Sequence, residues 1–269
     1  MRCWHKEPCL WEDRCVLLSV FTIKSFLCKD DLRSAGGQKT LQKNQHAPNL
    51  AVVTGASRGL GLELVVQLAR SGVEVIAACR EPERFALSRL DARITPVACD
   101  VTDALSVKKM AATLSGRPLD LLINNAGIRG ATDGLDAVEI KDFLAVMAVN
   151  VLGPLLVTRA LLPNLRLGRG LVANISSRAG SMAEGADPDG DYAYKCSKAA
   201  LNMATVKLAD DTGLTVLSLH PGWIKTDMGG ADAELAVSDS AAALLALLTK
   251  ADLSDSGTFR AFDGATVAW

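Results

Sequence analysis

The chain has 269 residues, 49% of them hydrophobic and 22% charged, and this composition excludes an intrinsically disordered protein. Lys and Arg total 29 against 30 Asp and Glu, so a net charge of −1 gives no bulk field that would attract nucleic acid or an anionic membrane. No uninterrupted apolar run reaches the roughly 18 residues that a membrane span needs. We expect a soluble enzyme or binding protein, with no nucleic acid and no membrane among its partners.

Residues 1–47 differ in composition from the rest of the chain. Residues 34–48 are polar and rich in Gly, Gln, Lys and Asn, which is typical of a linker. Acidic residues precede the apolar stretch at 16–23, which argues against a secretory signal, although organelle targeting by residues 1–47 stays open. We expect a poorly ordered extension over 1–47 and a single domain over 48–269.

The seven cysteines are odd in number and scattered, so they do not indicate a disulfide framework. This usage favours a reducing compartment, and a cytoplasmic location is expected. Five residues separate Cys3 from Cys9, and five separate Cys9 from Cys15. These gaps miss the usual zinc-ligand spacings, so no metal site is predicted.

From Asn49 onward, short apolar runs alternate with helical patterns. The runs predict buried strands at 50–54, 73–78, 94–98, 119–123, 171–175 and 214–219, with an edge strand at 258–262. Helices are expected at about 59–70, 103–115, 136–150, 154–167, 190–209 and 233–250. The alternation predicts an α/β fold: a Rossmann-type doubly wound parallel sheet of about seven strands with helices on both faces.

The turn after the first strand reads Thr-Gly-Ala-Ser-Arg-Gly-Leu-Gly, at residues 54–61. Gly55 permits a sharp turn, Gly59 removes a side chain where a dinucleotide would approach, and Gly61 lets the following helix pack closely. The amide groups at the start of that helix suit a pyrophosphate. The position between strand and helix favours a dinucleotide site over an ordinary glycine-rich turn, and the missing Gly-Lys-Ser/Thr excludes a P-loop.

The end of the second strand indicates which dinucleotide binds. An NAD site usually offers a carboxylate there, but this chain has Cys79 and Arg80, with Arg58 in the glycine-rich turn. Two guanidinium groups match a 2′-phosphate, so NADP(H) is favoured and NAD(H) is less expected. The alternative is that Glu81 pairs with Arg80 at the surface.

Polar residues also end the third and fourth strands. Asp100 is placed to meet an adenine edge, or else to cap the helix that begins near Asp103. Asn124-Asn125-Ala126-Gly127 suits a backbone that touches a ribose and bridges neighbouring strands, although such a stretch is also compatible with a plain turn.

The chain has two tyrosines, and only Tyr194 has a lysine four residues later, Lys198. The two side chains share one face of a helix, and a neighbouring ammonium favours the ionised phenol that general acid–base chemistry uses. Tyr192 has no such partner. Ser176 and Ser177 end a strand at the edge where ligands bind in such sheets. Asn150 lies where Gly153-Pro154 is expected to break two helices, either as a cap or as a holder of water.

In this order the motifs resemble the short-chain dehydrogenase/reductase family, from Asn49 to the C-terminus. They are Thr-Gly-Ala-Ser-Arg-Gly-Leu-Gly, Asn-Asn-Ala-Gly, Asn-Val-Leu-Gly-Pro (150–154), Ile-Ser-Ser (175–177), Tyr-Lys-Cys-Ser-Lys (194–198) and His-Pro-Gly (220–222). Segments 175–181, 192–202, 220–230 and 262–269 look most like the C-factor/sniffer-like carbonyl reductase branch.

The resemblance implies reduction of an aldehyde or ketone by NADPH, a small-molecule carbonyl substrate, and possible assembly into a homodimer or homotetramer. Tyr194 would protonate the carbonyl oxygen, Ser177 would hydrogen-bond it, Lys198 would bind the nicotinamide ribose and Asn150 would hold a relay water. A Gly/Asp-rich loop at 183–191 lengthens the gap to Tyr194, so the choice between Ser176 and Ser177 stays open. The implied cofactor-binding positions are Gly55, Ser57, Arg58, Gly59, Leu60, Gly61, Arg80, Asp100, Val101, Asn125, Ala126, Gly127, Tyr194, Lys198, Pro221, Gly222, Ile224 and Thr226.

Only a short flap, 223–232, follows the His-Pro-Gly motif, which predicts an open site for modest carbonyl compounds. Trp223 and Met228 would line that site or anchor the flap. One alternative class is an NADP(H)-binding signalling or sensor protein with vestigial catalysis. A sugar-nucleotide epimerase or dehydratase is disfavoured, because it normally has a longer C-terminal substrate region. Retention of Ser177, Tyr194 and Lys198 together favours the enzyme.

Overall fold

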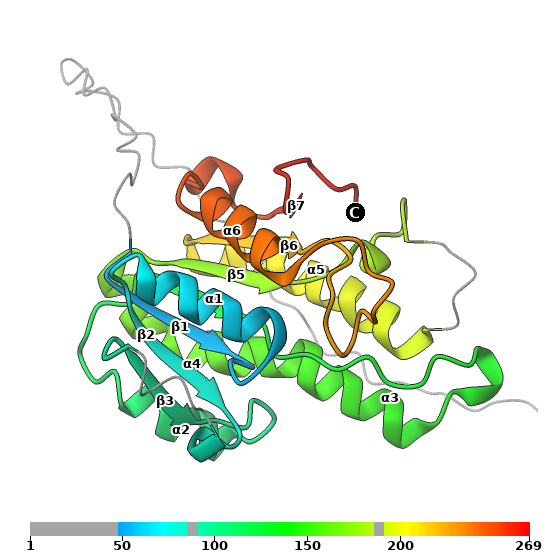
Figure 1. The fold of residues 1–269 in the computed structure, drawn as a ribbon, viewed down its shortest axis with the longest axis horizontal. Coiled ribbons are helices and arrows are strands. Elements are labelled where there is room, and N and C mark those ends of the chain that lie inside the picture. The colour runs from blue at the N-terminus through cyan, green and yellow to red at the C-terminus, as the bar shows by residue number, and fades with distance from the viewer. Residues whose placement is uncertain (1–47, 85–90, 186–190) are drawn as a thin grey trace, which may run out of the picture. The chain divides into compact units, whose positions relative to one another are not determined.

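The computed structural model describes residues 48–84, 91–185 and 191–269, so the predicted extension over 1–47 lies outside the described residues. These residues form one seven-stranded parallel sheet in the order β3-β2-β1-β4-β5-β6-β7 (Figure 1). Its strands are β1 (Leu50–Thr54), β2 (Glu74–Cys79), β3 (Ile94–Ala98), β4 (Leu121–Asn124), β5 (Leu171–Ile175), β6 (Thr215–His220) and β7 (Thr258–Ala261). The predicted Rossmann-type fold is confirmed.

The strand order reverses between β1 and β4, and this switch point positions the site. The chain runs outward through β2 and β3 and then returns to place β4 on the other side of β1. Loops leaving the carboxyl ends of β1 and β4 therefore diverge to opposite faces of the sheet, which opens a crevice for a ligand.

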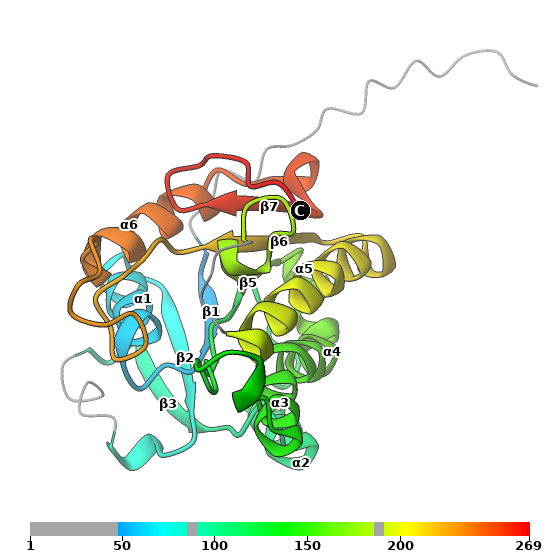
Figure 2. The same cartoon turned by 90° about the vertical axis from the view of Figure 1, so that its right-hand side faces the viewer.

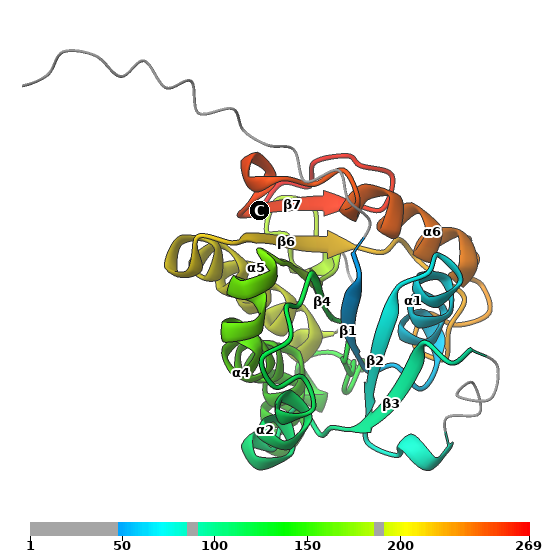
Figure 3. The ribbon, with the colours of Figure 1, turned by 90° about the vertical axis from the view of Figure 1, so that its left-hand side faces the viewer.

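Helices cover both faces of the sheet. They are α1 (Gly59–Arg70), α2 (Ala104–Ala112), α3 (Ile140–Met147), α4 (Gly153–Gly168), α5 (Tyr192–Thr212) and α6 (Val237–Leu248). Figures 2 and 3 show α1 and α6 together on one face, with α2, α4 and α5 on the other. The predicted three-layer arrangement follows from strands that are apolar on both sides.

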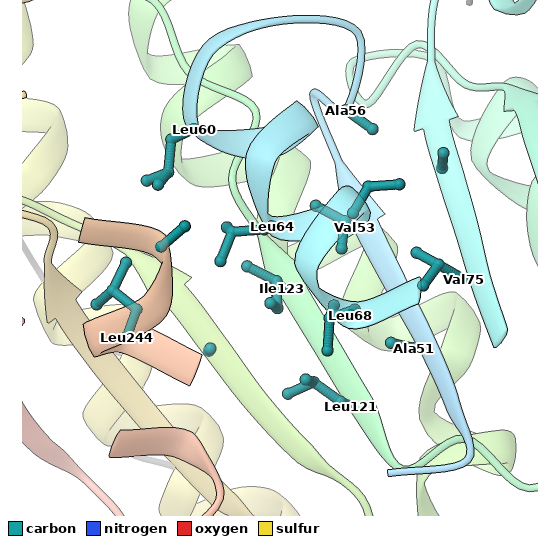
Figure 4. Packing of buried hydrophobic residues seen from close by; sticks show 14 of the residues in the cluster. Ala51, Val53, Ala56, Leu60, Leu64, Leu68, Val75, Leu121, Ile123 and Leu244 are labelled. Atoms are coloured by element: carbon teal, nitrogen blue, oxygen red, sulfur yellow. The ribbon is translucent and has the colours of Figure 1, made fainter. Parts of the chain in front are cut away.

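Strand β1 shows how the alternation of side chains builds two cores. Ala51 and Val53 belong to the cluster under α1 and α6, whereas Leu50 and Val52 belong to the cluster under α2 and α4. Figure 4 shows the first cluster, in which Leu60, Leu64 and Leu68 of α1 lie over β1 and β4. The spacing of these leucines on one face of α1 is the reason that the helix packs here.

The predicted break between two helices at Gly153-Pro154 is wrong. Residues Ile140–Gly168 form one continuous helical stretch, in which a single π-helical turn, Ala148–Leu152, joins α3 to α4. Pro154 is the second residue after the π-helical turn, and the stretch stays helical there although Pro154 has no N–H to donate. A Cβ on Gly153 would lie 2.9 Å from a methyl carbon of Val101, so glycine permits close packing there rather than a break.

By length and composition the same stretch, Ile140–Gly168, is long and apolar enough to cross a membrane, with a mean hydropathy of 1.8. Charged residues such as Lys141 and Arg159 interrupt this stretch, and the expectation from sequence considered only uninterrupted apolar runs. A core helix passes the same test, and in this fold Val157, Leu161 and Leu165 of α4 are fully buried in the second cluster.

Candidate active site

The predicted site residues gather along the carboxyl edge of the sheet. The glycine-rich turn follows β1, Asn125 follows β4, Ser176 and Ser177 follow β5, and Pro221 follows β6. Since β1, β4, β5 and β6 are consecutive in the sheet, these positions form one continuous row. Leu60, Val101 and Ile224 differ from the others, because their side chains are buried in the hydrophobic clusters.

Two glycines of the turn after β1 have no room for a side chain. A Cβ on Gly55, whose φ is +64°, would lie 2.8 Å from the Cα of Ala126. A Cβ on Gly61 would lie 2.3 Å from the Gly55 carbonyl oxygen. The side chain of Arg58 does not cap α1 and no acidic residue lies in its first turn, so the amino end of this helix suits an anion.

The Asn-Asn-Ala-Gly segment binds the glycine-rich turn through Thr54. The Thr54 hydroxyl accepts hydrogen bonds from the N–H groups of Asn125 (3.1 Å) and Ala126 (3.2 Å). The Asn125 amide in turn donates to the carbonyl oxygens of Thr54 (3.0 Å) and Gly55 (3.2 Å). The predicted bridging of neighbouring strands is therefore confirmed, and Thr54 is a supporting residue that the sequence pattern did not indicate.

The two guanidinium groups proposed for a 2′-phosphate lie in different surroundings. Arg58 forms an ion pair with Asp227 of the flap (2.5 Å), and both side chains are exposed. Arg80 is exposed at the end of β2.

Asp100 follows β3 and lies close enough to Arg80 for the positive charge of Arg80 to affect its pKa. Its carboxylate accepts two hydrogen bonds from Thr102, from the N–H (2.9 Å) and the hydroxyl (2.7 Å). These bonds, helped by the Arg80 charge, lower the pKa of Asp100. The alternative that Asp100 caps the next helix is wrong, because Asp103 caps α2 through the N–H of Leu105.

Tyr194 lies in the first turn of α5, close enough to the Ser177 side chain at the end of β5 for that hydroxyl to act on its pKa. Burial raises the pKa of Tyr194, and this outweighs the lowering by the Ser177 hydrogen bond and the positive charge of Arg129. The negative charge of Asp191 also raises it. The resulting direction is opposite to the one that Lys198 alone was expected to impose.

Lys198 lies one turn further along α5, with its Nζ 5.4 Å from the centroid of the Tyr194 ring. The side chain is buried, and its ammonium donates to the Ile175 carbonyl oxygen at 2.7 Å. Burial lowers the pKa of Lys198 to about 8. The group is therefore predominantly protonated at pH 7 and can act as a cation beside the phenol.

The structure separates the two candidate serines. The hydroxyl of Ser176 points into the core, where it donates to the Asn202 side-chain oxygen at 2.6 Å. The Ser177 hydroxyl instead accepts from the N–H of Ala179 and contacts Tyr194. Ser181, the next serine along the chain, accepts from the N–H of Glu184. Of the three, Ser177 has the geometry for a partner of Tyr194.

We therefore expect Ser177→Ala and Ser176→Ala to fail in different ways. Ser177→Ala should lower kcat by about 10²-fold, because the hydroxyl lies at the reacting group, and should cost at most about 1 kcal/mol of stability for the lost hydrogen bond from the Ala179 N–H. Ser176→Ala should cost about 1–3 kcal/mol of stability, because it leaves the buried Asn202 oxygen without its donor. Steady-state kinetics and urea unfolding measure the two effects. The same loss of kcat in both variants, with Ser177→Ala the less stable, would contradict the assignment.

Asn150 lies in the π-helical turn, and its amide is engaged on three sides. The side-chain oxygen accepts from the Ile128 N–H (2.9 Å), and the nitrogen donates to the Ile128 carbonyl (2.8 Å) and to the Ser197 hydroxyl (2.9 Å). Both donors are used, so a relay water would have to bind the remaining lone pair of the oxygen. Asn150 thus ties the loop after β4 to α5.

The flap after β6 is held by its own hydrogen bonds. The Trp223 indole N–H donates to the Gly229 carbonyl at 2.8 Å, and the Thr226 hydroxyl accepts from the Gly229 N–H at 3.1 Å. Trp223 therefore anchors the flap, which was one of its two predicted roles. A Cβ on Gly59 would lie 3.5 Å from a Thr226 methyl carbon, which places the flap beside the glycine-rich turn.

Arg129 and Asp191 flank Tyr194 as an ion pair whose Nη2–Oδ2 distance is 2.5 Å. The two residues are 62 positions apart in the chain, so no local sequence pattern indicates that they pair.

A parallel sheet with a glycine-rich turn at its switch point, and a tyrosine and lysine one turn apart beside it, defines a Rossmann-type oxidoreductase. The short chain dehydrogenase family model matches residues 49–235, and the chain belongs to this family of enzymes.

Named relatives agree with this membership. The chain is similar to C-signal of Myxococcus xanthus, with 42% identity over 167 residues that span 61% of this chain and 100% of the relative. An NADPH-bound carbonyl reductase from chicken fatty liver superposes with a TM-score of 0.76 at 35% identity, over 82% of this chain and 99% of that one. The carbonyl reductase Sniffer of D. melanogaster gives a TM-score of 0.76 at 31% identity, with the same two coverages.

Proposed function

We propose that this enzyme is an NADP(H)-dependent reductase that converts a small aldehyde or ketone to the alcohol. The observation that carries the proposal is the buried Lys198 ammonium 5.4 Å from the centroid of the Tyr194 ring, beside the switch point and with Ser177 close enough to act on the pKa of Tyr194. The carbonyl reductases of similar fold support the same reaction class.

Several features of the chain fit NADP(H). The amino end of α1 lacks a capping side chain and faces the carboxyl edge of the sheet. Arg58 and Arg80 offer guanidinium groups for a 2′-phosphate, and the structural relative from chicken is described as NADPH-bound. When bound, NADPH supplies the hydride that reduces the carbonyl carbon.

The side chains of the site then act on the carbonyl oxygen. Tyr194 donates its phenolic proton to that oxygen as charge develops on it, and the Ser177 hydroxyl donates a hydrogen bond to the same atom. Lys198 donates one ammonium N–H to the Ile175 carbonyl oxygen, so two N–H groups can bind the hydroxyls of a bound ribose. The cation also stabilises the phenolate that remains after proton transfer.

The substrate is expected to be modest in size, because the flap after β6 is short and its large side chains lie at the surface. Trp223 and Met228 are 54% and 42% exposed. Such a flap offers apolar contacts at an open site without enclosing a large ligand. The homodimer or homotetramer and the cytoplasmic location stay predictions.

The test is oxidation of NADPH at 340 nm with a panel of small aldehydes, ketones and quinones. We expect turnover that saturates with at least one carbonyl compound and yields the corresponding alcohol. Binding of NADPH without turnover on any member of the panel would overturn the reductase. That outcome would favour an NADP(H)-binding signalling protein, the second candidate, which the 42% identity to a protein named C-signal supports.

The choice of NADPH over NADH is expected to depend on Arg58 and Arg80. Replacing either by Met removes charge-assisted hydrogen bonds to the 2′-phosphate, so NADPH should bind about tenfold more weakly. NADH, which lacks that phosphate, should bind as before. Fluorescence titration of both nucleotides measures the two affinities, with Arg117→Met as a control at a distant ion pair. Equal weakening for NADH and NADPH would argue against 2′-phosphate recognition.

A further inference from the structure

Arg129 and Asp191 connect two elements of the candidate active site. The Nε and Nη2 groups of Arg129 both donate to Oδ2 of Asp191, at 2.9 and 2.5 Å. Arg129 lies in the loop after β4, and Asp191 directly precedes α5, the helix that carries Tyr194. The Asp191 side chain is only 5% exposed and that of Arg129 is 39% exposed, so the pair is shielded from water on one side.

A second attachment lies next to the first. Asn150 bonds both backbone groups of Ile128, the residue before Arg129, and its amide also donates to the Ser197 hydroxyl on α5. The loop after β4 is therefore tied to α5 at two places: directly through Arg129 to Asp191 before the first turn, and through Asn150 to Ser197 in the second turn. Tyr194 lies between these two points, and their combination restricts the tilt of this part of the helix.

Arg129 and Asp191 also act on Tyr194 through their charges. Arg129 lowers the pKa of the phenol and Asp191 raises it, while Lys198 lies under the ring and Ser177 hydrogen-bonds the side chain. With both partners present the two effects oppose each other. Removing one partner leaves the other as an uncompensated charge close to the phenol. The Asp191 Oδ1 atom is buried and forms no hydrogen bond within the described residues, which makes this carboxylate sensitive to the loss of Arg129.

We infer that Arg129 and Asp191 are a positioning pair, which fixes the place and the electrostatic surroundings of the Tyr194 phenol. The inference rests on the proposed function for the role of Tyr194, but its test does not require turnover. It assigns a task to two residues that lie 62 positions apart and outside the Ser-Tyr-Lys set.

The composition of the chain allows a direct measurement. Tyr192 and Tyr194 are its two tyrosines, so in a Tyr192→Phe background the tyrosinate absorbance near 295 nm reports Tyr194 alone. In this background we expect Arg129→Met to raise the pKa of Tyr194 and Asp191→Asn to lower it, because the first removes a nearby positive charge and the second a nearby negative one. The double variant should return toward the parent, and Arg129→Lys, which keeps the charge, should restore most of the parent titration.

The control is Arg117→Met, which breaks the Arg117–Glu74 ion pair at an exposed position. It should leave the titration of Tyr194 unchanged, and circular dichroism at each pH establishes that the variants are folded. Should Arg129→Met fail to fold, the nearly isosteric Asp191→Asn carries the test. A Tyr194 titration that Asp191→Asn does not move, or that the control moves equally, would overturn the positioning pair.

The two proposals fail separately. Opposite shifts from Arg129→Met and Asp191→Asn, in a protein that never turns over a carbonyl, would support the pair and overturn the reductase. A reductase that depends on Tyr194 but whose titration ignores both substitutions would support the function and overturn the pair.

Discussion

Replacing Tyr194 by Phe is expected to lower kcat of carbonyl reduction by about 10²–10⁴-fold, the range for loss of a positioned proton donor. The ring stays, so its contact with Lys198 and most of its packing are kept. Only the phenolic hydroxyl, and with it the interaction with nearby Ser177, is lost. NADPH should bind within a few-fold of the parent, because the phosphate-binding turn after β1 is untouched. Stopped-flow hydride transfer and a fluorescence titration measure the two quantities.

Tyr192→Phe is the matched control, on the same helix and two residues away. Its side chain is 45% exposed and has no lysine one turn along α5, so the same chemical change should leave kcat nearly unaltered. Loss of turnover in both variants would indicate damage to the start of α5 rather than loss of a proton donor. A Tyr194→Phe enzyme with unchanged kcat would remove Tyr194 from the mechanism.

The pH dependence also follows from the pKa directions. In the protein without cofactor, burial holds the pKa of Tyr194 above its ordinary value, so the phenol keeps its proton through neutral pH. That state is the one a proton donor needs for reduction. The reverse reaction, oxidation of an alcohol, needs the phenolate and should gain rate toward alkaline pH, where Lys198 also begins to lose its proton near pH 8.

Most of the fold could be predicted from the periodicity of apolar residues in the sequence. Strands β1, β3 and β5 begin and end where the apolar runs placed them, because a strand buried on both faces leaves an uninterrupted run bounded by turn residues. The other strands shift by one or two residues at one or both ends, where pairing rather than composition sets the boundary. The predicted break between α3 and α4 was wrong because glycine and proline are usually taken as signs that a helix ends. The local sequence does not show that Gly153 is needed for close packing against Val101.

Some residues of the candidate site could likewise be predicted from local spacing, and others could not. Tyr194 and Lys198 could be found because helical spacing places residues four apart on one face. Ser176 and Ser177 could not be separated, since which of two adjacent hydroxyls points into the core depends on Asn202, 26 residues from Ser176. Contacts made across the sheet, such as Arg129 with Asp191, have no local period and appear only when the strands are assembled in order.

Lys198→Met is expected to make the protein more stable and to remove most of its activity. Burial lowers the pKa of Lys198 from 10.5 to about 8, and at about 1.4 kcal/mol per unit the charged group destabilises the native state by about 3 kcal/mol at pH 7. Methionine removes that charge and fills similar space. Loss of the hydrogen bond to the Ile175 carbonyl subtracts about 1 kcal/mol, so a net gain of about 2 kcal/mol remains.

The pH dependence of stability distinguishes a destabilising buried charge on Lys198 from a simple difference in packing between Lys and Met. Below about pH 8 the lysine is protonated in both states, and the full destabilisation is present. Between about pH 8 and 10.5 the native state loses its proton while the unfolded chain keeps it, so wild-type stability rises relative to the variant. The advantage of Lys198→Met should therefore shrink through this window, whereas Lys250→Met, at an exposed position, should show no such trend.

Urea unfolding of wild type and both variants at pH 7 and pH 9.5 measures the difference, and NADPH oxidation measures the loss of turnover, expected at about 10²-fold. A variant less stable than wild type at pH 7 would mean that the buried ammonium is compensated by its surroundings. The expected result, higher stability with lost turnover, would mean that the fold tolerates a buried cation because the phenol beside it requires one.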